Sequence, residues 1–251
     1  MKLTQSGMKR STKMLVNADV KSLEVFVAAE LSDDKVLKEE LVNKLDLHSL
    51  NQARFNLPDR VTAKRFIFKL LYGATAYGYS VDSDFISCAM SQKDWQLVID
   101  EFYNKYTGIA KWHKKIIEQA MRDGFLEIPS GRFYEYRPKK NDWGQMKWPL
   151  TTIKNYPVQG FGADLVKLAR IDFHKRLQAS GLEAKFICTV HDSLVVDTPE
   201  ENVYNISKML KESIEYVPTA CRECFDYEFS LPIWCEIQVG PNKFDMKEIK
   251  V

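Results

Sequence analysis

The sequence lacks the features of a secreted or membrane-spanning protein. It has no secretory signal, no long apolar run and only 5 cysteines, an odd number that fits a reducing cytoplasm. Cys221 and Cys224 have the spacing of half a zinc site, but no second pair with that spacing exists. The net charge of +2 is too small to argue for nucleic-acid binding by itself. The sequence therefore predicts a cytoplasmic protein with no membrane partner.

Acidic residues are also missing from the first eighteen positions, which carry Lys2, Lys9, Arg10 and Lys13. We expect residues 1–14 to form a flexible basic arm. The sequence has 251 residues, of which 45% are hydrophobic. A chain of this length and composition can bury a hydrophobic core. This length predicts one compact unit or two closely packed ones.

The most informative stretch is residues 59–73, whose pattern predicts one amphipathic helix. Asp59 suits its N-cap, and Gly73 suits its C-terminal stop. Side chains four positions apart drift by only ~40° per step, so they form one slanting stripe. The stripe contains two cations and then two rings: Arg60, Lys64, Phe68 and Tyr72. This order suits a nucleotide, with its triphosphate at one end and its base at the other, although solvated cations beside core rings would give the same pattern.

Two aspartates follow β-rich runs, where a rigid sheet could hold them. Residues 14–18 are typical of a short strand that ends at Asp19 and turns into a helix. Residues 186–197 contain two β-rich runs, which predict a tight hairpin. The tip of this hairpin contains His191, Asp192 and Ser193. Helix capping would explain Asp19 and turn chemistry would explain Asp192, so the two form a metal site only if their carboxylates meet.

Several helices are expected between these two regions. One begins after Asp46, with His48 in its first turn. Ser91 and Asp94 form a capping-box pattern that opens a helix to about Tyr106, and another helix follows at 109–122. Residues 74–84 have the composition of a loop.

The second half of the chain begins with a predicted hairpin, with strands at 125–128 and 132–136. Residues 137–148 interleave four cations with two tryptophans, which predicts an exposed loop that is either solvated or touches a nucleic-acid backbone. Asn155 and Gln159 are expected just before a long helix at 161–177, where amides can donate to base edges or sugars. A final strand is expected at 233–239.

Taken in order, these pieces resemble the palm and fingers of family-A DNA polymerases, the DNA polymerase I type, and most closely the phage replicative branch. Residues 19–24 are similar to motif A, residues 59–73 to motif B and residues 190–193 to motif C. Residues 46–48 and 155–160 resemble two further motifs of the family. The five motifs occur in the family's order and span nearly the whole chain.

The resemblance implies an α+β fold, with a palm built from a small antiparallel sheet and helices, and with helical fingers. It implies a palm at 15–45 and 151–251, and fingers at 46–150 with the motif B helix at 60–73. The family has a thumb and an exonuclease domain before motif A, and eighteen residues cannot hold either, so we expect both to be absent. We therefore expect a split polymerase whose upstream half is a separate chain.

The resemblance also implies roles for individual residues. Asp19 and Asp192, with the backbone carbonyl of Val20, would hold two Mg²⁺ ions. The residues expected to bind the incoming dNTP are Glu24, His48, Arg60, Lys64, Phe68 and Tyr72. Lys64 would donate a proton to pyrophosphate, and Glu24 would exclude a ribose 2′-hydroxyl. The residues expected to contact primer–template DNA are Asn155, Gln159 and His191.

The chain departs from the family pattern at four positions. Ser193 stands where motif C usually has a glutamate, and Val20 stands where motif A usually has a tyrosine. We expect Ser193 to tune activity without abolishing it. Thr151 replaces an arginine found in many relatives, which puts a primer–template contact there in question. Phe68 in place of a tyrosine predicts discrimination against dideoxynucleotides.

Two other functions stay open. The chain could be a degenerate, non-catalytic DNA-binding remnant of the same fold, but retention of Asp19, Asp192 and Lys64 favours an enzyme. It could also be a template-independent nucleotidyltransferase, which Tyr72 and Gln159 argue against.

Overall fold

The computed structural model describes residues 13–141 and 143–251, so most of the predicted basic arm lies outside the described residues. The described chain forms two compact units. Unit 1 contains residues 13–21, 165–220 and 233–251, and unit 2 contains residues 22–164 and 221–232. These units are defined by contacts within the structure, whereas the palm and fingers are defined by function. The predicted palm and fingers boundaries therefore stay a prediction.

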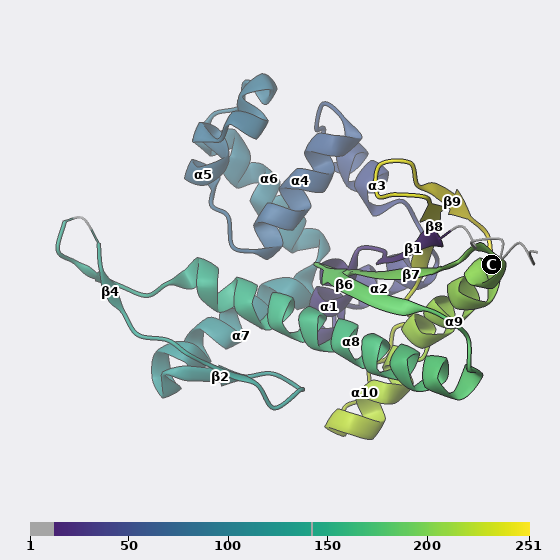
Figure 1. Cartoon of the computed structure of the whole chain (residues 1–251). Helices are drawn as coiled ribbons and strands as arrows, with labels where there is room; N and C mark the ends of the chain where they lie inside the picture. Colours follow the sequence, from purple (N-terminus) through teal and green to yellow (C-terminus); the bar gives the residue numbers. More distant parts are fainter. Residues whose placement is uncertain (1–12, 142) are drawn as a thin grey trace, which may run out of the picture. The chain divides into compact units, whose positions relative to one another are not determined.

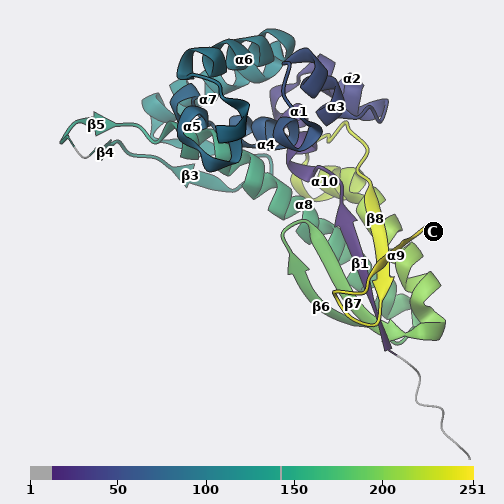
Figure 2. The same ribbon diagram turned by 90° about the horizontal axis from the view of Figure 1, so that it is seen from above.

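Unit 1 is built around a five-stranded antiparallel sheet with the order β6-β7-β1-β8-β9. Figure 2 shows β6, β7, β1 and β8 in this order. Its strands are β1 (Lys13–Val20), β6 (Lys185–Val190), β7 (Ser193–Pro199), β8 (Cys235–Gly240) and β9 (Lys247–Ile249). The strands predicted from β-rich runs are confirmed, while β9 lies in a charged tail with no strand pattern. The central position of β1 depends on pairing with segments more than 170 residues away, such as Asp19 with Ser193.

The side chains of β1 alternate between the two faces of the sheet. Val16, Ala18 and Val20 are buried, whereas Asp19 is only partly buried, so Asp19 lies on the opposite face. The helix α9 (Val203–Glu215) packs against β1, β7 and β8. Helix capping by Asp19 is therefore wrong, because Asp19 lies inside the strand.

Unit 2 is mainly helical (Figure 1). Its helices before the first hairpin are α1 (Leu23–Ser32), α2 (Lys35–Val42), α3 (Leu47–Arg54), α4 (Arg60–Leu71), α5 (Ala76–Val81), the 3₁₀ helix η1 (Ser83–Cys88), α6 (Gln92–Lys105) and α7 (Thr107–Asp123). Its core contains fully buried rings, with Trp95 stacked on Tyr79 at 5.0 Å and on Phe66 at 5.8 Å between centroids. Of the helices in the described part of the chain, none is both long and apolar enough to cross a membrane.

The predicted capping signals place the helices correctly. Asp59 accepts a hydrogen bond from the Thr62 amide at 2.8 Å and begins α4, and Gly73 follows its end with a φ of 87°. Ser91 and Asp94 form both halves of the capping box that begins α6. The prediction of a loop at 74–84 is wrong, because α5 and η1 lie there. Both are too short to show a helical repeat of apolar residues.

The chain after α7 also differs from two predictions. The strands β2 (Phe125–Glu127) and β3 (Phe133–Glu135) are confirmed, but the predicted loop at 137–148 contains a second hairpin of β4 (Lys139–Lys140) and β5 (Met146–Lys147). The helix α8 (Leu150–Ser180) starts eleven residues before its predicted start at 161. Asn155 and Gln159 therefore lie inside this helix and not before it. Pro157 lies in the interior of α8, where a proline removes one helical hydrogen bond.

The remaining helices follow the sheet. The 3₁₀ helix η2 (Glu200–Asn202) leads directly into α9. The helix α10 (Val217–Phe225) follows directly after Tyr216. Both α8 and α10 contribute residues to the two units.

Candidate functional site

Strand pairing makes Asp19 and Asp192 neighbours in unit 1. Asp19 lies opposite Ser193 across β1 and β7, and the Val20 amide donates a hydrogen bond to the Asp192 carbonyl oxygen at 3.1 Å. Opposed residues of an antiparallel pair have Cα atoms about 4.5–5.5 Å apart. The structure therefore makes the backbones of Asp19 and Asp192 neighbours, although the two residues are far apart in the sequence.

The turn between β6 and β7 has two residues, His191 and Asp192, because Val190 pairs with Ser193. His191 adopts a left-handed conformation with a φ of 53° and is exposed. Ser193 belongs to β7 and not to the turn. Its hydroxyl donates to the Val190 carbonyl at 3.0 Å, and the residue is only 7% exposed. Ser193 thus closes the turn from inside and offers no charge to a ligand.

The donors around Asp19 fit a hard cation. Carboxylate and carbonyl oxygens are the ligands that Mg²⁺ prefers, and Mg²⁺ is usually bound through one or two carboxylates plus substrate phosphates. Asp19 and Asp192 supply two such carboxylates. Within residues 13–141 and 143–251, no group of three or more His, Cys, Asp or Glu side chains could hold a metal ion. Asp19 and Asp192 would therefore supply only part of the ligand set of such an ion.

Glu236 is an acidic neighbour that the sequence did not reveal. It lies opposite Asp19 on β8, the strand on the other side of β1, and forms an ion pair with Lys21. Burial raises the pKa of the adjacent Cys235 thiol to about 12, and Glu215 and Asp19 raise it further. Glu236 lies in a strand that the sequence predicts. The sequence does not show which residue of β1 is paired with Glu236.

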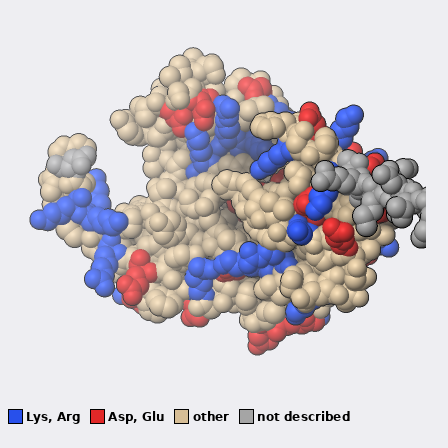
Figure 3. Space-filling view, viewed as in Figure 1, with Lys and Arg blue, Asp and Glu red and all other residues tan. Residues whose placement is uncertain are grey.

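The predicted phosphate-binding residues form a second group in unit 2. The Lys64 ammonium lies 5.8 Å from the centroid of the Phe68 ring, and the His48 and Phe68 ring centroids are 6.1 Å apart. The Arg60 Nε donates to the Asp46 carboxylate at 2.8 Å, and both side chains are about half exposed. Figure 3 shows Lys and Arg side chains gathered over α4. The structure thus combines cations and rings on one helix, as the stripe predicts.

The electrostatics of this group favour a neutral histidine. Burial lowers the pKa of His48 to about 4, and the charges of Arg60 and Lys64 lower it further. Its Nδ1 atom is buried and finds no hydrogen-bond partner among the described residues. The hydrogen bond from Arg60 lowers the pKa of the Asp46 carboxyl. Arg60 therefore has a carboxylate partner that an anionic ligand would have to replace.

The other predicted residues occupy separate places in unit 2. Tyr72 is partly buried at the C-terminal end of α4, and Glu24 is partly buried in the first turn of α1. Asn155 and Gln159 are four positions apart on α8, so they share one helix face. Gln159 is exposed, while the Asn155 Oδ1 is buried and has no partner among the described residues.

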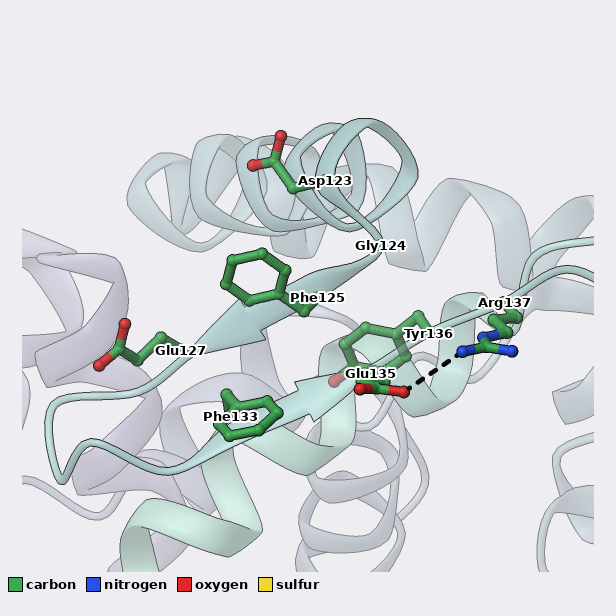
Figure 4. A pocket seen from close by; sticks show the side chains of 8 residues that line it. All are labelled: Asp123, Gly124, Phe125, Glu127, Phe133, Glu135, Tyr136 and Arg137. Carbon is green, nitrogen blue, oxygen red and sulfur yellow. Dashed lines mark ion pairs between the residues drawn. The ribbon is translucent and has the colours of Figure 1, made fainter.

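A cavity of about 540 Å³ lies beside the β2–β3 hairpin (Figure 4). It is lined by Asp123, Gly124, Phe125, Glu127, Phe133, Glu135, Tyr136 and Arg137. Phe125 and Phe133 are 43% and 62% exposed, and three carboxylates surround them. None of the predicted site residues lines this cavity.

Known proteins match this chain over most of its length. The model of the family described as DNA polymerase family A matches residues 6–245. DNA polymerase I of Pseudomonas aeruginosa is 28% identical over 237 residues, which cover 91% of this chain and 24% of that protein. The thermostable DNA polymerase I of Thermus aquaticus is 28% identical over 247 residues, which cover 94% of this chain and 27% of that protein.

A solved structure with a similar fold is described as the POL domain of Pol1 from M. smegmatis in complex with DNA primer-template and dNTP. It aligns with a TM-score of 0.78 and 22% identity, covering 91% of this chain and 40% of that chain. This similarity supports the predicted α+β polymerase fold. The chain spans about a quarter of the length of the curated relatives described above. Since the family model covers nearly all of the sequence, the chain belongs to DNA polymerase family A.

Proposed function

We propose that this chain is the catalytic palm and fingers part of a template-directed DNA polymerase, which adds deoxynucleotides to a primer 3′ end. The observation that carries the proposal is the pairing of β1 with β7, which makes Asp19 and Asp192 neighbours. The related M. smegmatis domain is described in complex with DNA primer-template and dNTP, which supports the same substrates here.

Asp19 and Asp192 are assigned to the reacting centre. With the Val20 carbonyl, they would hold two Mg²⁺ ions, which when bound stabilise the negative charge that develops during attack on the α-phosphate. The backbone of Asp19 lies in the sheet and that of Asp192 in the tight turn beside it, so little reorganisation is needed when substrates arrive. His191, beside Asp192 in an exposed turn, would lie near the primer terminus.

The residues of α3 and α4 are assigned to the dNTP. Arg60 and Lys64 would bind the β- and γ-phosphates, with neutral His48 as a hydrogen-bond donor. Lys64 would also give a proton to the departing pyrophosphate. The Phe68 ring would stack on the incoming nucleotide, and Tyr72 at the end of α4 would occupy the template-base position until the fingers close.

The remaining assignments concern sugar and DNA recognition. Glu24 would exclude a ribose 2′-hydroxyl by occupying its space. Asn155 and Gln159 would contact the primer–template duplex from one face of α8. All five cysteines are free, which supports the predicted cytoplasmic location. The phage replicative branch and a separate upstream half stay predictions.

The experiment is primer extension with Mg²⁺, comparing the wild-type chain with Asp192→Asn. Asp197→Asn is the matched control, since Asp197 is an aspartate of β7 that pairs with Lys13 away from the turn. We expect Asp192→Asn to reduce extension by about 10³-fold, which corresponds to ~4 kcal/mol. The control should extend primers at the wild-type rate.

Equal extension by the wild-type chain and by Asp192→Asn would refute the mechanism. A wild-type chain that binds primer–template DNA but never extends it, alone or with an added upstream polymerase half, would instead support the degenerate remnant. The two outcomes are separated by measuring binding and extension on the same substrate.

A further inference from the structure

The described residues of the β4–β5 hairpin include an exposed aromatic ring, that of Trp143. The Asn141 side-chain oxygen accepts hydrogen bonds from the Trp143 amide at 3.1 Å and from the Gln145 amide at 2.8 Å. Gly144 supplies a left-handed residue with a φ of 76°, and its amide donates to the Asn141 carbonyl. Trp143 is 80% exposed at this tip. The Trp143 ring is therefore exposed, while its own amide is hydrogen-bonded to Asn141.

Three lysines lie together on this hairpin. Lys139 pairs directly with Lys147 across the two strands, and Lys140 follows Lys139. Like charges opposed in this way destabilise a hairpin. All three side chains are exposed, and none has an ion-pair partner among the described residues. Figure 3 shows the resulting concentration of positive charge on the β4–β5 hairpin, at the left of the view.

Cations that have no ion-pair partner in the described part of the chain, next to an exposed aromatic ring, suit a single-stranded polynucleotide. Phosphates would neutralise the lysines, and an unpaired base would cover the Trp143 ring. A duplex offers no free base face along its length, because its bases are stacked on one another. A membrane surface fits less well, because binding there scales with apolar area and the tip offers one ring beside Gly144 and Gln145.

We infer that the β4–β5 hairpin is a binding site for single-stranded nucleic acid, with Lys139, Lys140 and Lys147 on the phosphates and Trp143 stacked on an unpaired base. None of these residues has a role in the proposed chemistry. The site would bind single-stranded nucleic acid without dNTP or Mg²⁺, so its binding can be tested independently of polymerase activity.

The test is fluorescence anisotropy of labelled oligo(dT) with the full chain, in EDTA and at several salt concentrations. The triple variant K139A/K140A/K147A is compared with K111A/K114A/K115A, which removes three exposed lysines from α7 and changes the net charge equally. We expect the hairpin variant to lower the salt slope of log K by about 2, at ~0.7 per phosphate contact, and the α7 variant to leave it nearly unchanged. Trp143→Ala should weaken binding by about 5- to 100-fold.

Circular dichroism melts of every variant show whether a loss of binding reflects a loss of folding. Equal salt slopes for the two triple variants would overturn the assignment of the lysines. Unchanged binding by Trp143→Ala would overturn the stacking. If the chain binds anionic phosphatidylserine vesicles in preference to oligo(dT), and Trp143→Ala loses this binding, the ligand of the hairpin would be a membrane surface and not nucleic acid.

Two further results keep this inference separate from the proposed function. If primer extension fails while oligo(dT) still binds through the hairpin, the hairpin site stands and the polymerase proposal falls. If primer extension depends on Asp192 but the hairpin variants bind oligo(dT) as the wild type does, the polymerase proposal stands and the hairpin site is refuted.

Discussion

The Val20 amide donates to the carbonyl oxygen of Asp192 at 3.1 Å, and this one hydrogen bond joins the end of β1 to the β6–β7 turn. It places Asp19, one residue earlier on β1, next to the turn that contains Asp192. A slip of one residue in the pairing of β1 would move Asp19 to the opposite face of the sheet. The proposed chemistry therefore depends on strand register as much as on residue identity.

Ser193 is expected to support this turn without taking part in the reaction. Ser193→Ala removes the hydrogen bond to the Val190 carbonyl, so the free energy of unfolding should fall by about 1 kcal/mol. The rate of primer extension should stay within about threefold of wild type, a change below ~0.7 kcal/mol in the barrier. Urea unfolding and single-turnover extension measure the two quantities. A large loss of rate with little loss of stability would assign Ser193 a direct role.

Phe68 is expected to make the enzyme discriminate against dideoxynucleotides. Its ring carries no polar atom that could replace the missing 3′-hydroxyl of such a substrate. In Phe68→Tyr the added hydroxyl can form one hydrogen bond, so discrimination should fall by about 10- to 100-fold, or ~1.4–2.8 kcal/mol. Competition between dideoxy- and deoxynucleotides in primer extension measures the ratio. Phe68→Leu is the matched variant, because it removes the ring without adding a hydroxyl. Phe66 is fully buried on α4, so Phe66→Tyr would disturb the core and cannot serve as a control.

Asp46 is expected to compete with the triphosphate for Arg60. Asp46→Ser keeps a residue that can cap α3 but removes the carboxylate that binds Arg60. Stability should change by less than about 1 kcal/mol, because the ion pair is exposed. The KM for dNTP should fall by a few fold, because Arg60 no longer has to leave a partner. An increase in KM would mean that Asp46 orients Arg60 toward the substrate.

His113 is expected to make the fold less stable in mild acid. Burial lowers the pKa of its side chain to about 3, so as pH falls below the ordinary value near 6.5 the unfolded chain takes up the proton first. The free energy of unfolding should then decrease by about 1.4 kcal/mol per pH unit for this residue between pH ~6.5 and ~5. Urea unfolding across this range measures the slope.

The matched pair of variants is His113→Gln and His174→Gln, since His174 is exposed. The slope should become shallower in His113→Gln only. His48, whose pKa is lowered to about 4, adds a contribution of the same sign in both variants. An unchanged slope in His113→Gln would show that His113 takes up its proton equally in the folded and unfolded chain.

The parts of the fold that depend on nearby residues could be predicted from the sequence. The N-cap at Asp59, the capping box of Ser91 and Asp94, and the hairpin around Asp192 are all local, and the structure contains each. The stripe on α4 also follows from helical spacing alone. These signals were sufficient to propose the candidate site.

The errors arose where tertiary contacts decide the structure. Buried Tyr79 anchors the short helix α5 through ring packing and a hydrogen bond to the Phe66 carbonyl, which composition does not show. The helix α8 extends back to Leu150 although it contains Pro157, which removes a helical hydrogen bond, so this extension does not follow from local propensity. Glu236 could not be placed beside Asp19, because its register with β1 joins segments that are distant in the sequence.

The most direct test of the central claim is a double-mutant comparison in single-turnover primer extension with Mg²⁺, using Asp19→Asn, Asp192→Asn and the variant with both changes. If the two carboxylates act as one metal-binding unit, each single change should reduce the rate by about 10³-fold, and the double variant should be at most ~10-fold slower than either. Losses that multiply in the double variant, or a single variant that keeps nearly wild-type activity, would contradict a shared site.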